Sequence, residues 1–279
     1  MLVKLAARRG VALPEIMFWR QAVTLPLLVG WLWARGSLGT LATHRLRSHA
    51  GRAMTGTVGM ITTFGAAMLL PLAVSTILGF TTPLFAAILG ALVLREKAGY
   101  WRWLAVVLGF VGVLIIARPG AMPISPLGAL AGLGSGLMVA IVSIQIRDLG
   151  RTEPPQATVF YFSLFGTLSL APLMPFVMIH HNPVQWLELL GIGLAGTIGQ
   201  LLLTAALRFG TVASVVAMDY TTLIWTTLFG WKIFDQLPPA STWAGAPLIV
   251  AAGLLITLRE HHASRRADPE MLGVQPVDG

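Results

Sequence analysis

The stretch GRAMTGTVG at residues 51–59 recurs 140 positions later as GIGLAGTIG at residues 191–199. Both copies keep three glycines in the same places, and a threonine follows the second glycine in each. Further matches at this offset need no gap: Gly10 with Gly150, Pro14 with Pro154, Thr81-Thr82 with Thr221-Thr222, Gly90 with Gly230, and Trp103 with Trp243. Chance overlap of glycine-rich apolar sequence would scatter such matches. The pattern therefore predicts two related half-bundles with a binding site where they meet.

Composition separates this chain from soluble proteins. Hydrophobic residues make up 56% of it and charged residues 11%, against roughly 25% charged in an average soluble domain. The net charge of +8 does not indicate a nucleic-acid partner, because the arginines lie in short gaps between apolar runs, as in cytoplasmic loops of membrane proteins. The chain has no cysteine, which rules out a disulfide framework or a thiolate metal site. The partner that the composition indicates is the lipid bilayer.

Nine segments are apolar and long enough to span a membrane, which takes about 20 residues of helix. They are Ile16–Trp33, Ala53–Leu70, Leu72–Leu94, Trp101–Ala117, Leu127–Ile146, Thr158–Ile179, Trp186–Leu207, Val212–Phe234 and Trp243–Leu258. The predicted fold is an all-α integral membrane protein, a polytopic helical bundle of two inverted repeats. An odd number of spans in a complete repeat inverts the second copy.

The repeats divide the chain unequally. Residues 1–120 form the first repeat, residues 124–262 form the second, and the polar residues 263–279 are expected to be a disordered cytoplasmic tail. The first repeat lacks its first helix, because Val3–Gly10 already matches Ser143–Gly150, the end of the first span of the second repeat. The missing helix would precede Met1.

Basic residues predict the orientation in the membrane. The segment Ala34–Arg52 carries four arginines, so it is expected to be a cytoplasmic loop. Alternating sides from there puts Arg147 and Arg208 on the cytoplasmic side together with the C-terminus, and puts His180 and His181 opposite.

Short motifs in both halves carry a family resemblance. They are Phe18-Trp19-Arg20, Thr82-Pro83-Leu84-Phe85, Leu94-Arg95-Glu96, Gly109 to Ile115 with Arg118-Pro119-Gly120, Ala205 to Gly210, Asp219-Tyr220, and Leu228-Phe229-Gly230-Trp231. The chain resembles the EamA-type branch of the drug/metabolite transporter superfamily over essentially its whole length. The resemblance implies a ten-helix carrier of the plasma (inner) membrane, with both termini cytoplasmic, that moves amino acids and other small metabolites, often outward.

Charged residues inside predicted spans are the leading candidates for a substrate site, since a charge near the bilayer centre costs about 2.5–3.5 kcal/mol on insertion scales. Asp219, followed by Tyr220, lies within the Val212–Phe234 span and is expected to bind a cationic group or a proton. Its alternative role is structural pairing with Arg20 or Lys4. Arg20, next to Trp19, is expected to hold a substrate carboxylate, unless it extends to the interface instead.

Polar and aromatic residues within apolar helices complete the predicted substrate site. Gln145, Gln200 and Thr63 are expected to hydrogen-bond a substrate, or else a neighbouring helix. Phe80 and Trp225 are expected to line the cavity, although core or lipid-facing aromatics would give the same pattern.

The function predicted on these grounds is secondary active transport of small metabolites, amino-acid-like or drug-like, with efflux by alternating access. A membrane-embedded lipid-modifying enzyme and a non-transporting truncated remnant are the alternatives. We predict no enzyme activity, catalytic residue, metal or cofactor, because no phosphate-binding loop, Ser-His-Asp set or paired carboxylates appear. The sequence leaves homodimer formation open.

Overall fold

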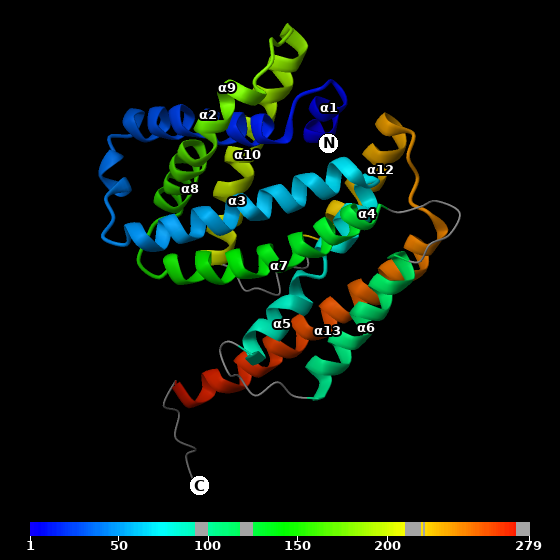
Figure 1. Cartoon of the computed structure of the whole chain (residues 1–279). Helices are drawn as coiled ribbons and strands as arrows, with labels where there is room; N and C mark the ends of the chain where they lie inside the picture. Colours follow the sequence, from blue (N-terminus) through cyan, green and yellow to red (C-terminus); the bar gives the residue numbers. More distant parts are fainter. Residues whose placement is uncertain (93–99, 118–124, 210–218, 220, 272–279) are drawn as a thin grey trace.

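The computed structural model describes residues 1–92, 100–117, 125–209, 219 and 221–271, and every regular element in them is a helix (Figure 1). The longer helices are α2 (Leu13–Ala34), α3 (Leu46–Leu69), α5 (Thr82–Leu92), α6 (Tyr100–Ala117), α7 (Pro126–Leu149), α8 (Pro155–Leu170), α10 (Pro183–Phe209), α12 (Thr221–Phe234) and α13 (Ala240–Met271). The shorter ones are α1 (Leu2–Arg8), η1 (Leu38–Leu41), α4 (Leu72–Gly79), η2 (Ala171–Leu173) and α9 (Met174–Val177). The predicted all-α polytopic fold is confirmed.

Each predicted span overlaps a described helix, although Val212–Phe234 does so mainly through α12. Five segments of the described chain are long and apolar enough to cross a membrane: Leu72–Leu92, Pro126–Leu149, Pro155–Val177, Pro183–Phe209 and Ala240–Leu258. Helices α2 and α3 contain 22 and 24 residues, enough to span about 30 Å at 1.5 Å per residue, but they carry more polar and charged groups.

Large apolar side chains project outward from many of these helices. Leu114, Leu130, Leu187, Leu202 and Ile224 are all more than half exposed. Soluble monomers rarely present so much apolar surface. A lipid-facing exterior explains these side chains.

The segment expected to be a cytoplasmic loop is shorter than predicted. Helix α2 ends at Ala34, and the φ of 62° at Gly36, two residues later, lets the Ser37 amide donate to the Leu32 carbonyl at 2.9 Å. Helix α3 then begins at Leu46, and it continues to Leu69 because no proline interrupts these residues. Arg52 is therefore inside a helix, where its side chain is buried.

The helices pack in pairs that match the 140-residue offset. Helix α3 packs on α7 and on α8, while α10, its counterpart in the repeat, packs on α1 and on α2. Figure 1 shows α3 beside α7 and α6 beside α13. Gly56 lies where α3 meets Phe162 of α8, and Gly196 lies where α10 meets Arg20 of α2. These equivalent places agree with two repeats, whose exact boundaries and inversion stay predictions.

The predicted span Leu72–Leu94 is broken between α4 and α5. Pro83 has no amide hydrogen to donate, so it cannot continue the hydrogen bonds of α4. Two threonine hydroxyls bond to carbonyls at the break instead, from Thr81 to Leu78 at 2.6 Å and from Thr82 to Gly79 at 2.8 Å. The backbone therefore turns inside the bundle with these two carbonyls satisfied.

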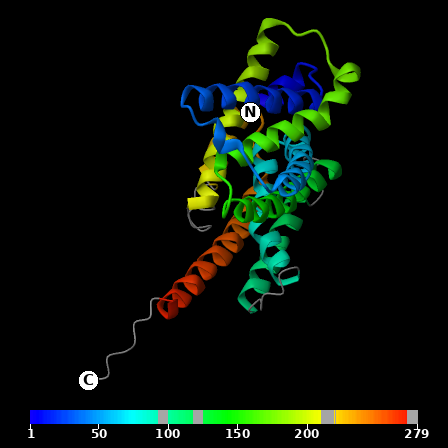
Figure 2. The same ribbon diagram turned by 90° about the vertical axis from the view of Figure 1, so that its left-hand side faces the viewer.

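Helix α13 differs from the expectation for the tail, because it extends to Met271, away from the helices on which it packs (Figure 2). The alanines, arginines and glutamate of the segment after Leu258 are good helix formers, and a helix can continue through them outside the apolar span. The rest of the predicted tail, residues 272–279, lies outside the described residues.

Packing at the crossing of α6 and α13 gives a testable prediction. A Cβ added at Gly112 would lie 2.7 Å from the Gly245 carbonyl oxygen, and one added at Gly245 would lie 2.4 Å from the Gly112 carbonyl oxygen. Gly112→Ala should therefore lower the melting temperature in detergent, with a loss of about 1–3 kcal/mol of stability. Gly51→Ala is the control, since its Cβ would meet nothing within 4 Å and alanine favours helix. Equal stability of the two variants would contradict this packing.

Candidate functional site

A cluster of polar side chains lies between α2, α3, α8 and α10. Its members are Arg20, Gln21 and Thr24 of α2, Arg52 of α3, Ser163 of α8, and Thr197 and Gln200 of α10. All are buried except Gln200, which is partly buried. Because these residues come from both halves of the sequence, only the folded chain brings them together.

Hydrogen bonds join the two halves through α2. The Arg20 guanidinium donates from Nη1 to Gln21 Oε1 at 3.2 Å and contacts Met60 Sδ at 3.0 Å. The Gln21 amide in turn donates to the Phe162 carbonyl at 3.4 Å. The hydroxyls of Thr24 and Thr197 lie 2.8 Å apart. The Ser163 hydroxyl also donates to Gln21 Oε1 at 3.5 Å, so Gln21 links α2 to α8 from both its amide atoms.

Arg52 is the second buried cation of the cluster. Its Nη2 donates to Gln200 Oε1 at 3.2 Å, and its guanidinium lies 3.9 Å from the centre of the Phe162 ring. Its Nε and Nη1 are buried without a hydrogen-bond partner. Most buried guanidinium nitrogens have partners, so this one is under-satisfied.

Two glycines make room for the two arginines. A Cβ at Gly56 would lie 2.2 Å from Arg52 Nη1, and a Cβ at Gly196 would lie 2.9 Å from Arg20 Nε. These are two of the glycines that repeat at the 140-residue offset. In this structure they allow close contact with charged side chains as well as helix packing.

The carboxylates nearest to this region have other partners. Among the described residues, Glu15 pairs with His181, Glu153 with His49 at 3.6 Å, and Glu188 with Arg9 at 3.2 Å. No ion pair joins either Arg20 or Arg52 to a described carboxylate.

The structure brings together some of the predicted site residues. Arg20 and Gln200 belong to the cluster, and Trp19 adjoins it. The indole of Trp19 packs edge-to-face on Trp186 at 4.8 Å, and its buried Nε1 has no hydrogen-bond partner. The predicted role of Arg20 in binding a carboxylate stays a prediction, but its side chain is buried, so it does not extend to the interface.

Other predicted site residues lie elsewhere. Gln145 donates to Thr55 at 3.2 Å, which links α7 to α3, and Thr63 is exposed. Phe80 lies in the apolar core formed by α4, α6 and α13. Trp225 of α12 is 56% exposed and stacks on Phe229.

Of the predicted pair Asp219 and Tyr220, the structure describes only Asp219. The Asp219 side chain is exposed, and Tyr220 lies outside the described residues. Arg20 and Lys4, the partners considered for a structural role of Asp219, hydrogen-bond to other groups, and both roles of Asp219 stay predictions. Lys4 donates to the Leu70 carbonyl at 2.5 Å and to Gln236 Oε1 at 3.0 Å.

Sequence reasoning missed Arg52, which it assigned to a cytoplasmic loop. The signal was present in the helical spacing. A helix that begins at Leu46 puts Arg52, Gly56 and Met60 on one face, four residues apart, and the other end of that face contacts Arg20. Gln21, Thr24, Ser163 and Thr197 of the cluster were also not among the predicted site residues.

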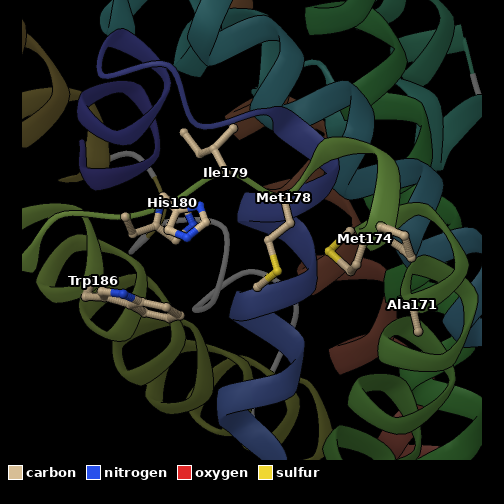
Figure 3. Close-up of a pocket in the computed structure, with 8 residues that line it drawn as sticks. Ala171, Met174, Met178, Ile179, His180 and Trp186 are labelled. Carbon is tan, nitrogen blue, oxygen red and sulfur yellow. The ribbon is translucent and has the colours of Figure 1, made fainter.

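A cavity of about 670 Å³ lies at the far end of α8 from Glu153. It is lined by Ala171, Met174, Pro175, Met178, Ile179, His180, His181 and Trp186. Figure 3 shows His180 between Trp186 and Met178. Trp186, which lines this cavity, also packs on Trp19, the residue before Arg20.

A buried pair borders this cavity. His181 Nε2 and Glu15 Oε1 are 2.5 Å apart, and both side chains are at most 1% exposed. The His181 ring also packs edge-to-face on Trp186 at 5.1 Å. This pair fixes the α9–α10 connection to α2.

Comparison with known proteins gives consistent similarities. The model of the EamA-like transporter family matches residues 1–118 and residues 126–258. A riboflavin transporter of Vibrio cholerae is 29% identical over 259 residues, which cover 92% of this chain and 87% of that protein. A pseudopaline exporter of Pseudomonas aeruginosa is 32% identical over 241 residues, which cover 80% of this chain and 84% of that protein.

More distant similarities extend the comparison. An S-adenosylmethionine uptake transporter of Rickettsia felis is 23% identical over 252 residues, which cover 90% of this chain and 85% of that protein. A solved crystal structure superposes with a TM-score of 0.63 and 20% identity over 94% of both chains. The latter similarity establishes a shared fold.

The buried pair beside the cavity gives a second prediction. His181→Leu removes the partner of a buried carboxylate, so it should cost about 3–5 kcal/mol of stability in a detergent melt. The double variant Glu15→Leu with His181→Leu should recover part of that loss, because no buried charge remains. His180→Leu is the matched control, since His180 is exposed. If His181→Leu melted like His180→Leu, the pair would have no structural role.

Proposed function

Because this chain belongs to the EamA-like transporter family, we propose that it is a secondary active transporter that exports small metabolites across the inner membrane by alternating access. The proposed substrates are amino-acid-like or drug-like compounds. The relatives are named as a riboflavin transporter, a pseudopaline exporter and an S-adenosylmethionine uptake transporter, so substrate and direction differ among them.

The observation that carries this proposal is the buried polar cluster built from both halves of the chain. Carriers made of two repeats bind their substrates at the repeat interface, near the middle of the bilayer. The cluster has that character, since Thr24 faces Thr197 and Arg52 bonds to Gln200 across the two halves. A lipid-modifying enzyme would need convergent catalytic groups at the membrane surface, and the cluster lies in the interior instead.

The two ends of α8 differ in a way that supports alternating access. At the Glu153 end, Arg45 pairs with Asp148, Thr43 donates to Glu153 Oε1 at 2.9 Å, and Arg208 donates to the Glu153 carbonyl at 3.1 Å. At the other end lies the cavity bounded by Trp186. We propose that the polar network closes the cytoplasmic end, and that the cavity belongs to the opposite, outer end.

This orientation makes the C-terminus cytoplasmic. An alkaline phosphatase fusion, which is active only in the periplasm, should therefore be inactive after Gly279. A fusion within the cavity-lining connection, after His180, should be active, because the proposal puts that connection outside. The reverse pattern would contradict the proposed topology.

Transport itself is tested with the full-length protein in proteoliposomes. We expect saturable movement of at least one compound from a panel of amino acids, their derivatives and nucleoside-like metabolites, with a rate that responds to an imposed proton gradient. Empty liposomes are the control. A well-folded protein that moves none of these compounds would count against the proposed function.

Asp219→Asn is the variant that tests the coupling role proposed for Asp219. The change preserves side-chain size and removes the titratable carboxylate, so it should abolish transport or its pH dependence while leaving the melting temperature nearly unchanged. Asp235→Asn is the matched control, because it removes a carboxylate at the end of α12. Normal, still pH-dependent transport by Asp219→Asn would exclude the role.

A further inference from the structure

We propose that Arg20 and Arg52 together bind one anionic group, a carboxylate or a phosphate, of the compound that the protein carries. The inference rests on the proposed function and names the chemical class of its substrate. It starts from two guanidiniums that are 8% and 2% exposed and that have no carboxylate partner among the described residues.

Burying a charge is costly unless an opposite charge or a full set of hydrogen bonds compensates for it. Arg52 has only Gln200 and the face of Phe162, and two of its three nitrogens have no hydrogen-bond partner. Arg20 has a neutral amide, Gln21, and a thioether, Met60. Neither set neutralises a positive charge.

Both guanidiniums have neighbours on the same two helices, α3 and α10. Arg20 contacts Met60, two turns along α3 from Arg52. It also lies against Gly196, one turn along α10 from Gln200, the partner of Arg52. Because both guanidiniums are positively charged, they repel each other. An anion between them would remove this repulsion and supply the missing acceptors.

The surroundings favour one small anionic group over a larger polar one. The Phe162 ring centre lies 3.9 Å from Arg52 Cζ and the Phe64 ring centre lies 5.9 Å from Arg20 Cζ, and a planar guanidinium donates hydrogen bonds only along its edges. Carboxylate and phosphate oxygens fit such edges. The hydroxyls of Thr24 and Thr197 lie nearby on the helices that hold Arg20. The same chemistry is found on soluble metabolites and on anionic lipid headgroups.

The test measures binding by thermal melting of the full-length protein in nanodiscs of phosphatidylcholine, which has no net charge. Benzoate and inorganic phosphate are the anionic probes, benzamide is the neutral match for benzoate, and sodium chloride controls for ionic strength. We expect a saturable rise in melting temperature with benzoate or phosphate and none with benzamide. No rise with either anion would overturn the proposal.

Arg52→Met keeps most of the side-chain length and removes the charge. It should weaken anion binding roughly 10- to 100-fold, which is the effect of losing a charged hydrogen bond. Without an anion it should melt at the same temperature as the unchanged protein or higher, because an uncompensated buried charge is gone. Arg52→Lys should retain part of the anion response. Arg147→Met, at an exposed arginine, should respond to anions like the unchanged protein.

A purely structural Arg52 would give a different result. Arg52→Met would then melt at a lower temperature and keep its anion affinity, and that outcome would overturn the proposal. Nanodiscs with phosphatidylglycerol distinguish the two sources of the anion. A lipid headgroup at the site would raise the melting temperature and remove the benzoate response, whereas a soluble ligand would leave that response in place, and both results support the anion site.

Thermal melting measures anion binding and does not require transport. The experiments can therefore contradict the anion site and the transport function independently of each other. A protein that binds anions at Arg52 but moves no compound would contradict the proposed transport function, while the proposed anion site would stand. A protein that transports neutral compounds and ignores both anions would contradict the site and leave the transport function.

Discussion

Close approach of helices at glycine is the constraint on which the rest of this structure depends. In a bilayer the hydrophobic effect does not drive helices together, so they associate through packing and hydrogen bonds where small residues let their backbones meet. Gly112 and Gly245 bring α6 and α13 into backbone contact. Gly56 and Gly196 do the same work beside the polar cluster, where they admit a guanidinium or an aromatic ring instead of a backbone.

Because Gly56 and Gly196 leave room for guanidinium groups, the interior of the bundle holds two positive charges. Arg20 and Arg52 occupy the space that side chains at Gly196 and Gly56 would fill, and the nearby carboxylates are held by other partners. A bundle selected for stability alone would gain from apolar groups in their place. Two buried charges with no counter-ion among the described residues agree better with the proposed binding site than with a purely structural role. Trp186, which packs on Trp19 next to Arg20, also lines the cavity at the end of α8 opposite Glu153.

Asp219 and the arginine pair suggest a division of labour in the proposed carrier. Asp219 lies in the segment before α12, whereas Arg20 and Arg52 lie among α2, α3, α8 and α10. Asp219 is exposed, whereas the guanidinium pair is buried, where it is suited to hold a fixed anion. The two predicted roles therefore require different surroundings.

The sequence by itself determined the fold class, a helix at each of the nine predicted spans, and the family. It could do so because the length of an apolar run and a short motif can be read directly from the order of the residues. It also identified Arg20 and Gln200 as polar residues within apolar helices. Only the tertiary structure decided that Arg52 joins them, that Phe80 lies in an apolar core and that Thr63 faces outward. The reason is physical: the orientation of a helix, and hence the partners of its side chains, depends on which helices pack against it, and that information is spread over residues far apart in the sequence.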